Sequence, residues 1–246
     1  MLDIAIIGGT GLTSLPNLEI IKREMVHTPY GEPSGPVVYG KIGQKEVIFL
    51  PRHGTGHTIP PHKINYRANI WALHSIGVKK VVAIAAVGGI DARHGPGYLV
   101  VPDQLIDYTW SRVSTFFEDD LPHVTHIDFT YPYNDGLRKQ IIEACREAGL
   151  DVASTGIYGA TQGPRLETAA EINRMEKDGC TIVGMTGMPE ACLARELELE
   201  YATCAVVANM GAGRGEGEIS MVEIEQTIDK GMGKIKAMLE KLVSML

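Results

Sequence analysis

The sequence has few cysteines, a deficit of basic residues and no long apolar run, and each shortage excludes a class of protein. Its 246 residues include four cysteines, none of them in a C-x-x-C pair, so zinc-finger and thioredoxin-type sites are excluded. Four cysteines are also too few for a disulfide scaffold of this length. Buried, reduced thiols are therefore expected at Cys145, Cys180, Cys192 and Cys204. No stretch reaches the roughly 18 consecutive apolar residues of a membrane-spanning helix.

The charge balance narrows the choice of partners. Lys and Arg number 23 against 30 Asp and Glu, a formal net charge of −7. Nucleic-acid binders usually carry a basic patch or a high isoelectric point, so no nucleic acid is expected as a partner. Phosphate is still an acceptable ligand, because one anion needs only a few placed donors. The first residues, MLDIAIIGGTG, lack the basic region and apolar stretch of a signal peptide, so we expect a cytoplasmic chain without membrane contact.

The order of apolar segments predicts the fold class. Hydrophobic residues make up 44% and charged residues 22%, ordinary values for a globular protein. Short apolar runs alternate with segments of helical spacing, a pattern typical of α/β proteins. Without a repeat or a linker-like change of composition, residues 1–246 are expected to form a single domain. Strands are expected at Ile4–Ile7, Val37–Tyr39, Val47–Leu50, Val81–Ala86, Tyr98–Val101, Thr155–Ala160, Ile182–Met185 and Ala202–Ala208.

Three helices carry recognisable start signals. Asn134 can cap a helix whose apolar positions recur at helical spacing. The T-x-x-E pattern at 168–171 and the S-x-x-E pattern at 220–223 are both typical of capping boxes. The second pattern opens a long amphipathic C-terminal helix. Gly231 and Gly233 weaken this helix by about 1 kcal/mol each relative to alanine.

Glycines and polar residues follow several predicted strands, where open α/β sheets bind ligands. After the first strand, Gly8-Gly9-Thr10-Gly11 brings backbone N–H groups and a hydroxyl together, which suits an anion. It lacks the third glycine of a dinucleotide fingerprint. Arg52 and His53 follow another strand, and arginine supplies a fork of donors matched to phosphate. We expect His57 and His62 to lie in a solvated loop, and the histidines match no metal-binding pattern.

The remaining segments are open to two interpretations from the residues alone. The small residues at 85–89 favour either a close approach to the backbone or dense strand–helix packing. Glu167 is either a surface charge beside a helix N-terminus or a group that faces a ligand. Residues 184–190 predict a strand that turns into a helix with Pro189 in its first turn. Asn209 ends a buried strand with an amide that both donates and accepts.

These segments, in this order, resemble the trimeric purine nucleoside phosphorylase and methylthioadenosine phosphorylase family. The resemblance spans essentially the whole chain. It rests on IGGTGL at 7–12, TPYGEPS at 28–34, RHG at 52–54, NYRANIWAL at 65–73, THIDF at 125–129, GPRLET at 163–168, MTGMPE at 185–190 and the strand ending at Asn209. It implies a three-layer α/β/α sandwich around a central mixed β-sheet. It also implies phosphorolysis of an N-glycosidic bond, with inorganic phosphate as co-substrate and no metal or organic cofactor.

The resemblance further implies a role for each matching position. Phosphate contacts are carried over to Thr10, Arg52, His53, the backbone of Ala86, and Thr186. Met185 matches a methionine packed against the ribose, while Leu166, Glu167 and Asn209 match the base-binding positions. Arg52, Thr186 and Asn209 are the residues expected to carry catalysis. His126 matches a residue that reaches the neighbouring subunit's site, so a homotrimer is implied.

Asn209 is the informative departure from the methylthioadenosine branch. Enzymes of that branch carry Asp here and a second Asp two residues on, whereas this chain has Asn209-Met210-Gly211. Asn209 resembles the asparagine of 6-oxopurine phosphorylases: its oxygen accepts from N7–H and its nitrogen donates to O6. Glu167 resembles the glutamate of those enzymes that contacts N1–H. A site built for one hydrogen-bond pattern can discriminate against the wrong base by about 10⁴.

The residues expected at the 5′ end of the sugar are apolar. Relatives that act on inosine or guanosine use a histidine for the 5′-hydroxyl, and no histidine occurs near the start of the C-terminal helix. Met221 and Ile224 are three apart, share one helix face and can form an apolar pocket. Val222 is expected to take part in ordinary core packing. A 6-oxopurine site with an apolar 5′ pocket predicts 5′-methylthioinosine as the substrate.

Four alternatives are kept beside this prediction. The chain is alternatively a methylthioadenosine phosphorylase with relaxed base specificity, or a general 6-oxopurine nucleoside phosphorylase. A non-catalytic purine-binding protein on the same fold would bind the base without phosphate-dependent cleavage. A nicotinamide-dependent oxidoreductase fits least, because its fingerprint is incomplete.

Overall fold

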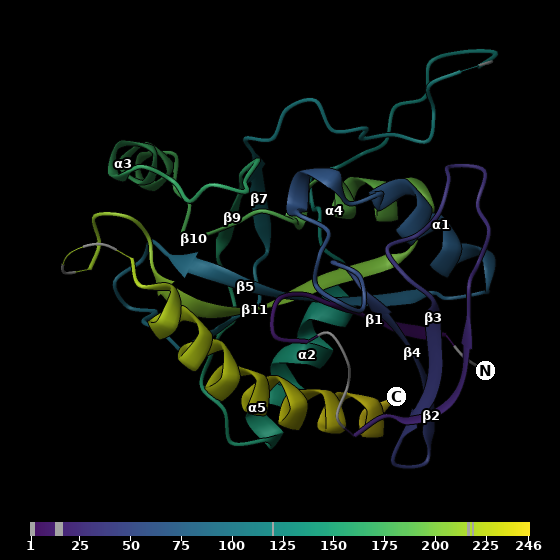
Figure 1. Cartoon of the computed structure of the whole chain (residues 1–246), viewed down its shortest axis with the longest axis horizontal. Coiled ribbons are helices and arrows are strands. Elements are labelled where there is room, and N and C mark those ends of the chain that lie inside the picture. The colour runs from purple at the N-terminus through teal and green to yellow at the C-terminus, as the bar shows by residue number, and fades with distance from the viewer. Residues whose placement is uncertain (1–2, 13–16, 120, 216, 218) are drawn as a thin grey trace.

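A mixed β-sheet forms the middle layer of the computed structural model, which describes residues 3–12, 17–119, 121–215, 217 and 219–246 (Figure 1). Within these residues eleven strands join one sheet. The strands are β1 (Ile4–Gly8), β2 (Glu19–Glu24), β3 (Val37–Ile42), β4 (Lys45–Pro51), β5 (Lys80–Gly89), β6 (Leu99–Val100), β7 (Gln104–Asp107), β8 (Val152–Ala153), β9 (Ile157–Ala160), β10 (Ile182–Gly184) and β11 (Glu200–Met210).

Helices cover both faces of this sheet. They are the short 3₁₀ helix η1 (Pro61–Lys63), α1 (Tyr66–Ser75), α2 (Asp135–Glu147), α3 (Ala169–Lys177), α4 (Gly187–Glu196) and α5 (Met221–Met245). Side chains of α1 and α4 pack with one face of the strands, and side chains of α2 and α5 pack with the other. Figure 1 shows these two helix pairs on opposite sides of the sheet. The expected three-layer α/β/α sandwich is confirmed.

The order of the strands brings distant parts of the chain together. The main path runs β2-β3-β4-β1-β5-β10-β9-β7, and β11 pairs with β5 and β6. β1, β4, β5 and β11 run parallel where they pair, and so do β7, β9 and β10. Within each group the loops after the strands share one edge of the sheet. The two groups run in opposite directions, because β10 pairs antiparallel with β5.

All eight predicted strands overlap observed ones, and the sequence patterns missed β2, β7 and β8. The residues of β2, EIIKRE, are exposed along the whole strand. An edge strand of this kind shows no alternation of apolar and polar residues for a pattern to detect. β7 and β8 have four and two residues, too few for periodicity to carry a signal.

The three capped helices are confirmed. The side chain of Asn134 accepts from the backbone N–H of Leu137 at the start of α2, and both halves of the capping box are present at α3. The side chain of Ser220 accepts from the N–H of Glu223 at the start of α5. α1 was not predicted, although its cap is of the same kind, with Asn65 accepting from the N–H of Ala68.

Gly231, expected only to weaken α5, lets the helix approach the sheet. A Cβ atom at this position would lie 2.8 Å from a side-chain carbon of Val206 on β11. The same does not hold for Gly233, where a Cβ atom would meet open space. Gly231 therefore lowers the intrinsic stability of the helix but allows α5 to pack closely against β11.

The four cysteines are free thiols. Cys145, Cys180 and Cys204 are buried as predicted, whereas Cys192 is only partly buried and its Sγ lies 3.2 Å from the carbonyl oxygen of Ser114. Across the described ranges, none of the helices is both long and apolar enough to cross a membrane.

Candidate active site

A cavity of about 300 Å³ is lined by residues of β5 and β11, by the loops after β1, β4, β9, β10 and β11, and by the first turns of α5. Eleven of the twelve site residues expected from the sequence line it. They are Thr10, Arg52, His53, Ala86, Leu166, Glu167, Met185, Thr186, Asn209, Met221 and Ile224. The sheet thus brings together segments that lie up to about two hundred residues apart, and the loops after β9 and β10 enter from the opposite direction because β10 is antiparallel to β5.

One edge of β5 is open to this cavity at Ala86. The N–H of Lys80 donates to the carbonyl of Asp3, and the N–H of Ile90 donates to the carbonyl of Thr181, so the even-numbered residues of β5 face the β1 and β10 edge. β1 pairs with β5 as far as Ala83, and β10 joins the same edge at Gly88. Between them Ala86 turns its backbone N–H toward the cavity, which favours close approach over mere dense packing.

Arg52 is buried at the wall of the cavity, with 1% of its surface exposed. Its Nε donates to Oε2 of Glu190 over 2.6 Å, and a terminal nitrogen donates to Oε1 of Glu190 over 2.8 Å. The other terminal nitrogen donates to the carbonyl of Ile84 over 2.8 Å. Of the five guanidinium N–H groups, three are used within the protein and two are left for a ligand. The pair of donors formed by Nε and one terminal nitrogen, which has the spacing of two phosphate oxygens, is thus occupied by Glu190.

Glu190 is a site residue that the sequence patterns did not single out. It lies on α4 with no exposed surface, and its Oε1 also accepts from the hydroxyl of Tyr201 over 2.8 Å. Although burial by itself lowers the pKa of Arg52, the charge of Glu190 and its hydrogen bonds raise that pKa above its ordinary value. Arg52 is therefore held charged and fixed in place before any ligand arrives.

His53 is a neutral, oriented imidazole. Desolvation by burial, with a smaller effect of the neighbouring charge of Arg52, lowers its pKa to about 4 against the opposing bond to the Ile59 carbonyl. That carbonyl can only accept, so Nδ1 of His53 carries the hydrogen of the 2.8 Å bond. Nε2 is left as an acceptor. His57 lies in an exposed loop, as predicted, and also lines the cavity with its ring centroid 4.6 Å from that of His53.

Met185 and Thr186 follow β10. Thr186 is 8% exposed and occupies the N-cap position of α4, but its hydroxyl makes no capping bond there. Met188 has an extended backbone, with φ −121° and ψ 140°, so the regular part of α4 begins at Pro189, as its place in the sequence predicted. The helix therefore does not use the Thr186 hydroxyl, and Thr186 lines the cavity.

Glu167 faces the cavity and is held from behind by Thr161. The Thr161 hydroxyl donates to Oε1 of Glu167 over 2.7 Å, and Thr161 lines a neighbouring cavity that also borders Glu167. The carboxylate therefore stands in the wall between the two cavities. The sequence left open whether Glu167 is a surface charge, and its position favours a group that faces a ligand.

Asn209 is aimed by a β-bulge. β11 pairs with β5 in register up to Val207 opposite Val87, and then Asn209 stands opposite Gly88, so Ala208 is the extra residue. Such a bulge reverses the face to which the following side chain points. Nδ2 of Asn209 donates to the carbonyl of Met210 over 2.7 Å, which leaves one N–H and the amide oxygen for a ligand.

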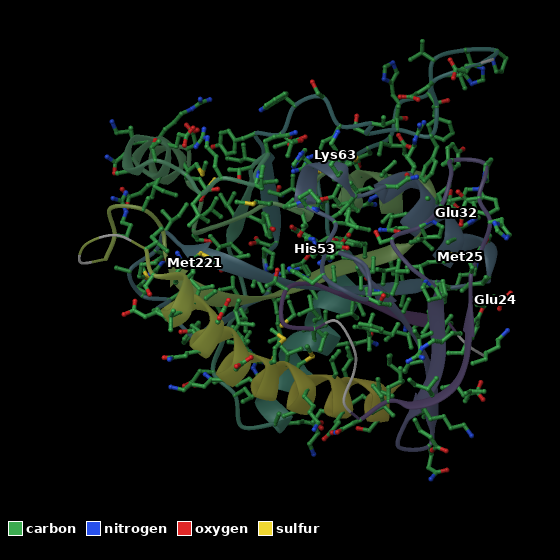
Figure 2. All side chains as sticks on the ribbon, in the orientation of Figure 1. Glu24, Met25, Glu32, His53, Lys63 and Met221 are labelled. Atoms are coloured by element: carbon green, nitrogen blue, oxygen red, sulfur yellow. The ribbon has the colours of Figure 1, made fainter. Side chains whose placement is uncertain are left out.

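The first turn of α5 adds an apolar wall. Ile224 and Ile228 are buried against Ala208, and both line the cavity together with Met221 and Ile219. Figure 2 shows Met221 at the N-terminal end of α5 and His53 nearer the middle of the molecule. Met221 is 59% exposed in the single chain. The prediction for Val222 was wrong: it is 62% exposed, because it points away from the face that Ile224 buries.

His126 is the expected site residue that the cavity does not contain. It lies in the segment between β7 and α2, which extends beyond the helices and the sheet (Figure 1). His126 is exposed, and the described lining of the cavity does not include it. Its role in a neighbour's site stays a prediction.

Comparison with known proteins gives a consistent assignment. The sequence model described as the Phosphorylase superfamily matches residues 3–244. A relative from Pseudomonas syringae pv. tomato named a probable S-methyl-5′-thioinosine phosphorylase is 55% identical over 98% of both chains. A relative from Pyrococcus furiosus named a 6-oxopurine nucleoside phosphorylase is 48% identical over 92% of this chain and 86% of its own.

The solved structures agree with these relatives. A methylthioadenosine phosphorylase from Schistosoma mansoni in complex with adenine superposes with a TM-score of 0.95. It is 31% identical, and the match covers 100% of this chain and 92% of that one. The sheet and the helices of this chain therefore have the arrangement found in that enzyme.

Proposed function

The chain belongs to the Phosphorylase superfamily, and from this premise we propose that it cleaves 5′-methylthioinosine with inorganic phosphate. The products are hypoxanthine and 5-methylthioribose 1-phosphate. The observation that carries this proposal is the composition of the cavity wall. It combines an amide and a carboxylate suited to a 6-oxopurine with an apolar patch where inosine phosphorylases are expected to have a histidine.

Asn209 and Glu167 recognise the purine in this proposal. The free N–H of Asn209 donates to O6, its oxygen accepts from N7–H, and Glu167 accepts from N1–H. Leu166 lies beside them in the cavity wall and covers a face of the base. A 6-amino purine presents a donor at position 6 and no hydrogen at N1, so it would leave these partly buried groups unpaired.

The phosphate lies among Thr10, Arg52, His53, Ala86 and Thr186 in this proposal. The two hydroxyls, the Ala86 N–H and the remaining Arg52 N–H groups donate to its oxygens, while Nε2 of neutral His53 accepts a phosphate O–H. A phosphate oxygen then bonds to the anomeric carbon of the sugar as the bond to the purine N9 breaks. The electron pair passes to the purine, which takes a proton from water at N7, and the amide oxygen of Asn209 accepts a hydrogen bond from that N7–H.

The positive charge that develops on the sugar is stabilised by the phosphate beneath it. The charged, pre-oriented Arg52 balances the phosphate without reorganisation during the reaction. Met185 packs against the ribose and limits its movement. No organic cofactor takes part in this scheme, and phosphate is the co-substrate.

The apolar residues of α5 select the 5′ substituent. A methylthio group against Met221 and Ile224 gains roughly 1–2 kcal/mol from burial. A hydroxyl group at the same place finds no partner on these side chains and loses its hydrogen bonds to water.

We also propose a cytoplasmic homotrimer of single-domain chains spanning residues 1–246, in which His126 of each subunit completes a neighbour's site. The exposure of His126 on an extended segment supports this arrangement. A symmetric trimer repeats the same contact three times and closes on itself.

The direct test compares phosphate-dependent cleavage of 5′-methylthioinosine, 5′-methylthioadenosine and inosine by the purified protein. We expect the highest kcat/KM for 5′-methylthioinosine. A higher value for 5′-methylthioadenosine would identify a methylthioadenosine phosphorylase with relaxed specificity. Equal values for inosine and 5′-methylthioinosine would identify a general 6-oxopurine phosphorylase. Binding of hypoxanthine without any cleavage would overturn the enzymatic proposal.

A further inference from the structure

Arg112 lies outside the cavity, yet it joins two of the loops that form it. One loop, residues 161–167, follows β9 and ends at Glu167, and we name it the base loop. The other, residues 185–188, follows β10 and contains Met185 and Thr186, and we name it the sugar–phosphate loop. β9 and β10 are parallel neighbours, so both loops leave the same edge of the sheet.

The guanidinium of Arg112 donates to both loops at once. Toward the sugar–phosphate loop, one terminal nitrogen donates to the carbonyls of Met185 over 2.8 Å and Met188 over 2.6 Å. Toward the base loop, the other donates to the carbonyls of Thr161 over 3.1 Å and Gln162 over 2.7 Å. The two sets of bonds come from opposite ends of one rigid plane.

The Nε atom and the flat face of the Arg112 guanidinium also have partners within the protein. Nε donates to the side-chain oxygen of Gln162 over 3.2 Å, and the guanidinium lies over the ring of Tyr66 at 5.5 Å from its centroid. All five N–H groups therefore have an acceptor inside the protein. A group whose donors are fully used in this way is not available to bind a substrate.

A cation at this point serves a clear physical purpose. Four backbone carbonyls from two loops converge on one place, and their oxygens carry partial negative charge. The planar guanidinium neutralises them and sets their spacing, whereas the single ammonium of lysine cannot span both sets. Because the guanidinium is rigid, it holds the base loop and the sugar–phosphate loop at a fixed distance from each other.

We propose that Arg112 is a positioning residue that sets the separation between the base loop and the sugar–phosphate loop for the phosphorolysis step. The proposal rests on the function proposed above. Glu167 must hold the purine while Thr186 holds phosphate, and the bond that breaks lies between the two. Misplacing either loop by about 1 Å can reduce the rate roughly 100-fold, even when each ligand still binds.

The experiment uses Arg112→Lys, with Arg138→Lys as the matched control. Arg138 is 8% exposed and donates to the carbonyls of Pro102, Val101 and Ser154, so it makes the same kind of bonds away from the cavity. For each variant we would measure kcat/KM with 5′-methylthioinosine, melting temperature, and the Kd of hypoxanthine alone and of inorganic phosphate alone by calorimetry.

We expect Arg112→Lys to lose about 100-fold in kcat/KM while the two separate Kd values stay near those of the unmodified chain. Both variants should lower the melting temperature by a similar amount, because each replaces a guanidinium that binds several backbone carbonyls. Arg138→Lys should nevertheless leave kcat/KM unchanged. Equal losses of activity in both variants, or a normal kcat/KM for Arg112→Lys, would overturn the proposal. Absence of turnover in the unmodified chain would contradict the proposed function instead, so the two failures are distinct.

Arg112→Ala gives an independent reading, because free guanidinium at millimolar concentration can enter the space left by the side chain. Recovery of kcat with guanidinium but not with urea supports a positioning role for the planar cation. Should this variant not fold, the comparison of the two lysine variants still decides the question.

Discussion

At the residue scale, base recognition depends on the amide of Asn209. Replacing it with Asp removes the donor that faces O6 and places a carboxylate beside that oxygen, which suits a 6-amino group instead. We expect Asn209→Asp to raise the ratio of kcat/KM for 5′-methylthioadenosine over 5′-methylthioinosine roughly ten- to hundredfold, as for one mismatched buried hydrogen bond. Kinetics with both substrates would measure the ratio. An unchanged ratio would show that Asn209 does not read position 6.

The buried pair of Arg52 and Glu190 leads to a prediction about stability. Glu190→Gln leaves the Arg52 charge buried without its counter-charge, so we expect the free energy of unfolding to fall by about 3–5 kcal/mol. The KM for phosphate should change as well, because Arg52 loses the partner that orients it. Urea denaturation and phosphate titration measure the two effects. Glu143→Gln on α2, whose salt bridge with Arg146 joins two exposed side chains, is the control and should cost less than about 1 kcal/mol.

His53 makes stability depend on pH. Its pKa falls from 6.5 to about 4 through desolvation on folding, so between these values the unfolded chain binds a proton that the folded chain does not. Acidification therefore favours unfolding. The contribution of neutral His53 to the free energy of unfolding is complete above pH 6.5 and is lost as the pH falls toward 4. We expect the free energy of unfolding of His53→Asn to fall less steeply over this window. Parallel curves for the variant and the unmodified chain would contradict the assignment.

At the scale of elements, the first turn of α5 supplies the pocket for the 5′ substituent. We expect Met221→Ser to lower kcat/KM for 5′-methylthioinosine about tenfold and to affect inosine much less, because an apolar contact is lost. Val222→Ser is the matched control, since Val222 is exposed one residue further along and does not line the described cavity. Equal losses for both substrates would assign Met221 a packing role only.

Local signals predicted three of the capped helices and the strands with apolar cores; α1 was missed despite its Asn65 cap, and the missed strands carry no such signal. α2, α3 and α5 begin at Asn134, Thr168 and Ser220 because a side chain accepts from a free N–H of the first turn. Exposed β2 and the two-residue β8 have no buried face of their own to leave a pattern. They exist because a neighbouring strand offers hydrogen bonds.

At the scale of the whole molecule, the proposed trimer predicts complementation between subunits. His126→Ala leaves a chain whose own cavity is intact, and Thr186→Ala leaves a chain whose His126 is intact. Refolding the two variants together should give more activity than either alone, because mixed trimers contain sites with both groups. His123→Ala, on the same exposed segment, is the control and should remain active by itself. Sedimentation would report the oligomer, and no gain on mixing would contradict a shared site.

The sequence by itself determined the α/β class, most strands, the capped helices and eleven of the residues that line the cavity, because each leaves a local pattern or a matching motif. Only the tertiary structure decided how these residues act. It brought Glu190 into an ion pair with Arg52 and the Thr161 hydroxyl into a hydrogen bond with Glu167. It also packed the ring of His57 beside that of His53 and put Arg112 between two loops. These partners are up to 138 residues apart. No spacing along the chain encodes them, because strand order and one bulge in β11 set which side chains meet.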